Sequence, residues 1–67
     1  MIKQEYSGKK IELTDIDGKV WHGKVVMITP AVDSDSGENE LTIRVGKGLT
    51  EFKESEIEAI EEVKEDK

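Results

Sequence analysis

The stretch that decides the fold is "IDGKVWHGKV", residues 16–25, in which two glycines five positions apart interrupt an otherwise strand-like run. The Asp17-Gly18 pair is the strongest short signal for a β-hairpin, because both central residues of a type I′ turn need positive φ. Gly23 falls inside the following run, where a glycine typically marks a bulge or a bend at a barrel corner. We therefore predict a hairpin that turns at Gly18 and a long second strand that bends at Gly23.

The residues on both sides of this turn alternate as half-buried strands do. In "KKIELTDI", residues 9–16, Ile11 and Leu13 share one face. In the second strand, residues 19–28, the alternation assigns one set of side chains to the core face: Trp21, Gly23, Val25 and Met27. It assigns a mixed set to the outer face: Val20, His22, Lys24, Val26 and Ile28.

The rest of the chain continues the β pattern. Pro30 ends the second strand, because proline cannot donate to a ladder, and residues 31–40 are predicted to be a loop. Residues 40–45 and 49–53 alternate again around a turn at residues 46–48. The stretch "ESEIEAIEEVKEDK" leaves two alternatives open, since Ser55 and Glu58 have the form of a helix capping box. We favour a 3₁₀ turn over residues 55–57 and a closing strand over residues 59–63.

These elements predict an all-β fold, a small, strongly bent antiparallel barrel of five strands with a short 3₁₀ turn before the last one. Residues 1–63 are expected to form one domain, and residues 64–67 a frayed tail. A core of twelve inward side chains is predicted: Tyr6, Ile11, Leu13, Trp21, Val25, Met27, Leu41, Ile43, Val45, Phe52, Ile57 and Ile60.

Composition narrows the class of protein. The 67 residues contain no cysteine, so disulfide frameworks and thiolate zinc sites are excluded and a cytoplasmic protein is expected. Neither a signal peptide nor a membrane span is predicted, because no run approaches 18 apolar residues. The net charge is −6: residues 1–30 carry five basic and four acidic side chains, and residues 31–67 carry five and twelve. This excess of acid disfavours nucleic acid and favours a protein partner with a basic surface.

The run "YSGKKIELTDIDGKVWHGKVVMITPAVD", residues 6–33, resembles the first motif of Sm-like proteins, which share a small barrel with the Src-homology-3-like folds. Gly8, Gly18 and Gly23 occupy glycine places of that motif, and its apolar places are taken by Ile11, Leu13 and Val25. The resemblance spans residues 5–45 and implies the barrel fold. Short uncharacterised bacterial proteins of the same design are similar too.

The RNA-contacting places of the family differ in this chain. Thr29 and Asp33 stand where the family has Asp and Asn, and "KESE", residues 53–56, stands where it has an Arg-Gly pair. An acidic side chain in place of an amide removes a donor near phosphates. The resemblance therefore supports the fold more than the family's RNA-binding function.

Three features of the sequence are candidates for a chemical site. His22 is the only histidine, the residue type most often used in acid–base catalysis, but no cysteine and no serine in a nucleophile-elbow context accompanies it. The loop "DSDSGENE", residues 33–40, fails the calcium-loop pattern because Gly37 stands where Asp or Asn belongs. Trp21 is better placed in the core than on a base-stacking surface. We expect no enzymatic activity, no cofactor and no metal.

The sequence thus predicts a non-enzymatic, acidic interaction module that mediates protein–protein contacts or self-association. Its predicted interface is the outer face of the second strand: Val20, His22, Lys24, Val26 and Ile28. The alternative is an Sm-like RNA-binding protein with altered contacts, in which Lys9, Lys10, Lys19 and Lys24 gather on one side.

Overall fold

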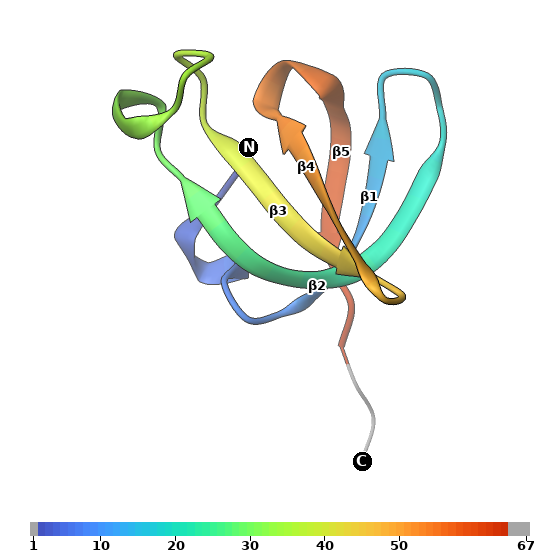
Figure 1. The fold of residues 1–67 in the computed structure, drawn as a ribbon. Helices are drawn as coiled ribbons and strands as arrows, with labels where there is room; N and C mark the ends of the chain where they lie inside the picture. Colours follow the sequence, from blue (N-terminus) through green and yellow to red (C-terminus); the bar gives the residue numbers. More distant parts are fainter. Residues whose placement is uncertain (1, 65–67) are drawn as a thin grey trace.

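The computed structural model describes residues 2–64, which form five antiparallel β-strands and three short 3₁₀ turns (Figure 1). The elements follow in chain order: η1 (Gln4–Tyr6), β1 (Lys10–Asp15), β2 (Val20–Thr29), η2 (Ala31–Asp33), β3 (Glu40–Val45), β4 (Gly48–Lys53), η3 (Glu54–Glu56) and β5 (Ile57–Glu62). The strands pair in the order β4-β3-β2-β1-β5. Within residues 2–64 no ladder joins the edge strands β4 and β5, so the sheet is not closed.

Strand β2 connects the two halves of the sheet, and its bend gives the molecule its shape. Residues 20–24 pair with β1, whereas residues 24–29 pair with β3, and Figure 1 shows β2 strongly curved between them. Gly23 lies where the pairing passes from one neighbour to the other. A Cβ at Gly23 would overlap the backbone carbonyl oxygen of Arg44. Only glycine therefore lets β3 approach β2 this closely.

The hairpin between β1 and β2 turns at Gly18, as predicted, but it is not a type I′ turn. Gly18 has a φ of +85°, while no residue other than glycine has positive φ in the described part of the chain. Gly18 N–H donates to the Asp15 carbonyl at 2.9 Å, and Asp15 N–H donates to the Lys19 carbonyl at 2.9 Å. This pattern is a three-residue loop, a turn followed by a left-handed glycine, which needs positive φ only at Gly18.

A β-bulge in β2 overturns the predicted facing of its last residues. Val25 pairs with Ile43, but Met27 pairs with Thr42, so Val26 is the extra residue. One extra residue reverses the alternation that follows it. Met27, predicted to be in the core, is 58 % exposed, and Ile28, predicted on the outer face, packs against the core.

The core is a single cluster to which every strand and η1 contribute. Its buried members are Tyr6, Ile11, Leu13, Val25, Leu41, Ile43, Phe52 and Ile57. Three further predicted core residues, Trp21, Val45 and Ile60, are partly buried against this cluster. Eleven of the twelve predicted side chains therefore lie in or against it, and Met27 is the exception. Because β1, β4 and β5 cover the same cluster, the sheet coils around one core.

The ambiguous C-terminal segment forms a 3₁₀ turn and a strand, which excludes the helical alternative. The turn η3 begins one residue earlier than predicted, and β5 begins at Ile57. The predicted loop after Pro30 contains the turn η2. Of the predicted tail, residues 64–67, only Lys64 is among the described residues.

Candidate binding surface

The predicted interface residues of β2 do not form a continuous apolar patch. Val20 is 45 % exposed and Val26 is 40 % exposed. His22 and Lys24, both exposed, lie between them. The surface at the centre of the predicted interface is therefore polar.

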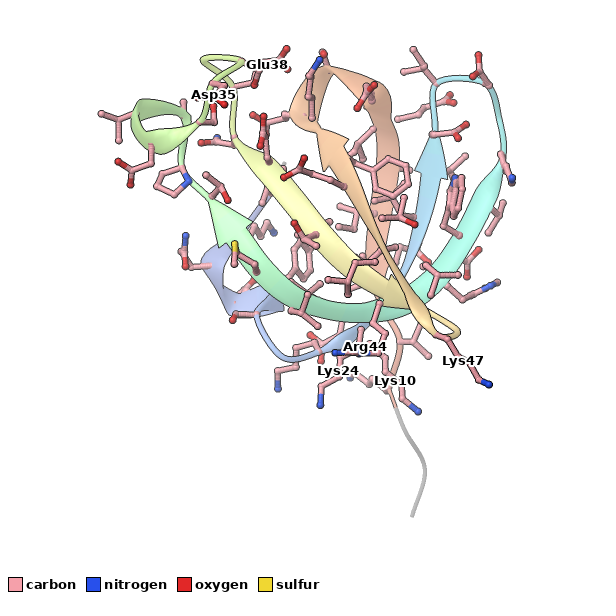
Figure 2. The ribbon with its side chains drawn as sticks, viewed as in Figure 1. Lys10, Lys24, Asp35, Glu38, Arg44 and Lys47 are labelled. Atoms are coloured by element: carbon pink, nitrogen blue, oxygen red, sulfur yellow. The ribbon has the colours of Figure 1, made fainter. Side chains whose placement is uncertain are left out.

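A row of cations crosses three neighbouring strands at one end of the molecule. Lys24 of β2 is directly opposite Lys10 of β1 on one side and Arg44 of β3 on the other. Figure 2 shows these side chains together at one end, with Lys47 of the β3–β4 turn beside them. Like charges at directly opposite positions destabilise a sheet. In this chain of net charge −6, the three cations lie side by side across β1, β2 and β3.

Two adjoining hollows lie at this end. The larger hollow, about 560 Å³, is lined by Gly8, Glu62, Val63 and four lysines. The lysines are Lys9, Lys10, Lys24 and Lys64. The smaller, about 340 Å³, has a largely apolar lining of Ile11, Gly23, Gly46 and Val63, flanked by Lys10, His22 and Arg44. Both hollows share Lys10 and Val63. We call the six cations of this region the basic end: Lys9, Lys10, Lys24, Arg44, Lys47 and Lys64.

Acidic side chains gather at the opposite end, where Figure 2 places Asp35 and Glu38. Hydrogen bonds join the segments of this end to one another. Ile16 N–H donates to the Glu56 carbonyl at 3.1 Å, and Ser55 N–H donates to Glu38 Oε1 at 2.8 Å. We call this region the acidic end: Asp15, Asp17, Asp35, Glu38, Glu40, Glu51, Glu54 and Glu56.

Asp15 organises the β1–β2 turn at the acidic end. Its Oδ1 accepts from the backbone N–H groups of Asp17 and Lys19, each at 2.9 Å, and its Oδ2 accepts from Trp21 Nε1 at 2.9 Å. The hydrogen bond from Trp21, followed by those from Lys19 and Asp17, holds the pKa of the Asp15 carboxyl below its usual value of 3.8. Asp15 is therefore an anion fixed within the turn.

Trp21 lies partly buried rather than on an exposed stacking surface. Its ring meets Phe52 edge-on at a centroid distance of 5.3 Å, and Lys19 Nζ lies 4.3 Å from the ring centroid. Lys19 therefore lies apart from Lys9, Lys10 and Lys24, which line one hollow. Three of the four lysines expected on one side are together, and Lys19 is at the acidic end.

The acidic loop after η2 uses its side chains to hold the loop in place. Glu38 accepts from Ser55 through both carboxylate oxygens, and Glu40 accepts from Ser36 Oγ at 2.7 Å. Asn39 accepts from Ala31 N–H at 2.8 Å. Among residues 2–64 no group of three or more acidic or histidine side chains is arranged to hold a metal ion.

His22 is a surface residue paired with β1. Its side chain is 70 % exposed, and its Nε2 lies 3.7 Å from Glu12 Oε1 on the neighbouring strand. The pair lies beside the smaller hollow, which His22 helps to line. It can act as a polar contact for a bound partner.

Sequence reasoning named Lys24 as an interface residue but missed Arg44, Lys47 and Lys64. Their sequence separation from Lys24 is large, and only the strand register brings Arg44 opposite Lys24. The outward position of Arg44 between Ile43 and Val45 was the only signal available for it.

Comparison with known proteins identifies no relative of this chain. Searches against protein-family models, curated proteins and solved structures found no match for this chain. No helix within residues 2–64 is long and apolar enough to cross a membrane.

Proposed function

We propose that this protein is a non-enzymatic protein-interaction module, a small barrel of the Sm-like or Src-homology-3-like type that binds through its basic end. The five antiparallel strands, the bend at Gly23 and the 3₁₀ turn before β5 support this type of barrel. The Lys10–Lys24–Arg44 row carries the functional proposal. Lys and Arg side chains form charge-assisted hydrogen bonds with carboxylates, so three of them side by side offer a site for an acidic segment.

The partner that fits the basic end is an acidic protein segment. Strands in a sheet lie about 4.8 Å apart, so the row extends over roughly 10 Å. That length matches two or three carboxylates of a peptide. Net charge alone led us to expect a partner with a basic surface. We propose an acidic partner for the basic end, because its six cations are concentrated away from the acidic end.

The same geometry favours a protein over a nucleic acid. A polynucleotide extends well beyond the row, and the chain's net charge of −6 repels the phosphates that would lie outside it. The larger hollow, where Lys9, Lys10 and Lys24 meet, is the observation that favours RNA binding as the second candidate function.

Fluorescence anisotropy with two labelled probes tests this proposal. We expect a decapeptide of alternating Asp and Ile to bind the full chain, and Lys24→Glu combined with Arg44→Glu to abolish that binding. Lys3→Glu, an exposed charge reversal that removes a contact with Glu5, is the matched control and should bind as the parent does. Nanomolar binding of a single-stranded RNA decamer, with none of the peptide, would contradict the proposal and support the alternative.

A further inference from the structure

The acidic end carries an exposed apolar side chain in an acidic setting. Ile16, at the tip of the β1–β2 turn, is 62 % exposed and lies between Asp15 and Asp17. Its neighbours in space include Glu51 and Glu56, which line a small hollow with it. The tip therefore combines an apolar anchor with carboxylates, the combination that the basic end would recognise.

The backbone of this tip is fixed before any partner arrives. Asp15 Oδ1 holds the N–H groups of Asp17 and Lys19, and Ile16 N–H is held by the Glu56 carbonyl at 3.1 Å. A segment that is already ordered loses less conformational entropy on binding. Ile16 is thus held in an exposed position by a turn that is already ordered.

The smaller hollow at the basic end complements this tip in both chemistry and charge. Val63, 39 % exposed, provides the main apolar side chain of this hollow, since Gly23 and Gly46 have none and Ile11 is only 1 % exposed. The hollow's volume of about 340 Å³ is within the range of ligand pockets. Lys10 and Arg44 flank it. An apolar side chain that entered the hollow would bring its acidic neighbours up to these cations.

We propose that the β1–β2 tip of one copy docks into the smaller hollow of a second copy, with Ile16 inserted and Asp17 facing the Lys10–Lys24–Arg44 row. This inference rests on the proposed function and names its acidic partner as another copy of the same chain. The contact joins two different surfaces, so each copy keeps one free tip and one free basic end. Such head-to-tail contacts produce rings or open chains.

Two blocked variants test the contact by analytical ultracentrifugation from micromolar to millimolar concentration. The parent chain should increase in mean mass with concentration above its monomer mass of 7.5 kDa. One variant blocks the basic end by Lys24→Glu with Arg44→Glu, and the other blocks the tip by Ile16→Lys with Asp17→Lys. Each should remain monomeric alone, and an equimolar mixture should give a discrete species of twice the monomer mass.

The controls separate this contact from general charge effects and from misfolding. Val32→Lys puts a cation on another exposed apolar residue, 88 % exposed, and Lys3→Glu reverses a charge outside both contact surfaces; both should associate as the parent does. Far-ultraviolet circular dichroism must show the parent spectrum for every variant.

A parent chain that stays monomeric throughout, or blocked variants that do not combine, would overturn the self-docking inference. Binding of the acidic decapeptide by that monomeric parent, lost in the basic-end variant, would leave the proposed function standing. If the peptide fails to bind while the blocked variants combine, the basic end binds the β1–β2 tip of another copy and not acidic segments in general.

Discussion

Gly23 is required by its neighbour across the sheet and not by its own dihedral angles. Its hydrogen faces the Arg44 carbonyl oxygen at the point where β2 changes partners. A methyl group there would collide with backbone, which cannot move aside as the end of a flexible side chain can. The bend of β2 and the floor of the smaller hollow therefore depend on the same missing side chain.

Substitution of Gly23 by alanine should lower the free energy of unfolding by about 1–3 kcal/mol, the usual cost of overpacking. The new Cβ would also lie 3.3 Å from Ile43 Cδ1. Gly48→Ala is the matched control, since nothing lies within 4 Å of a Cβ at that position. Urea denaturation of the two variants measures the difference, and equal stability of both would contradict the close-approach explanation.

Asp15 makes a contribution to stability that depends on pH. Because its pKa is held below 3.8 in the folded chain, first by Trp21 and then by the backbone N–H groups of Lys19 and Asp17, the contribution is complete above 3.8. It is lost as the pH falls through the depressed pKa. Asp15→Asn should therefore lower the melting temperature at neutral pH, and the difference from the parent should shrink well below pH 3.8.

Thermal unfolding followed by circular dichroism across this pH range measures the effect. Val32→Ala, an exposed substitution that involves no titratable group, is the control and should differ from the parent by the same amount at every pH. A difference between Asp15→Asn and the parent that stays constant with pH would contradict the assigned hydrogen bonds.

At the scale of the elements, the bulge at Val26 decides which side chains of β2 support the core. It adds one residue between Val25 and Met27, so that Ile28 faces Leu41 and the core while Met27 faces solvent. The bulge also lets the second half of β2 follow β3 after the bend.

Ile28→Ala should therefore destabilise the chain by at least about 1 kcal/mol, since it removes packing from the core. Met27→Ala should change stability by no more than about 0.5 kcal/mol, as surface substitutions do. Chemical denaturation of both variants checks this order. The reverse order would mean that β2 keeps a regular alternation to its end.

These elements show how far the sequence alone can lead. The strands, the turn at Gly18 and the bend at Gly23 were predictable because alternation and glycine placement are local signals. The three-residue form of the hairpin, the bulge at Val26 and the Lys24–Arg44 pairing were not, because they depend on the register between strands. Of the candidate site, the sequence predicted Lys24 and His22 as interface residues and, in the RNA-binding alternative, Lys9 and Lys10, whereas the cations on β3, in the β3–β4 turn and after β5 were missed.

At the scale of the whole molecule, the fold gathers six cations at one end and eight carboxylates at the other. The basic end draws its cations from both halves of the chain, from Lys9 to Lys64. At the acidic end, the β1–β2 turn and the loop after η2 are both hydrogen-bonded to η3. A net charge of −6 therefore describes neither end.

We expect the cation row to lower the free energy of unfolding and to raise the affinity for an acidic partner. Lys24→Gln removes the central charge and should raise the free energy of unfolding at low salt by about 0.2–1 kcal/mol. The gain should shrink as salt rises, because the Debye length falls from about 10 Å at 0.1 M to about 3 Å at 1 M. Affinity for the acidic decapeptide should fall in the same variant.

Urea denaturation at two salt concentrations, with anisotropy on the same samples, measures both effects. Lys3→Gln, which loses its 4.0 Å contact with Glu5, serves as the control and should show no gain in stability. A loss of stability in Lys24→Gln at low salt would mean that the row supports the fold.

The bond between Trp21 and Asp15 has a practical consequence. The chain contains one tryptophan, and its indole N–H is tied to the carboxylate that organises the turn bearing Ile16. Indole emission depends on the polarity and the hydrogen bonding of its surroundings. Intrinsic fluorescence can therefore follow events at this turn in the unlabelled protein, against a background free of any other indole.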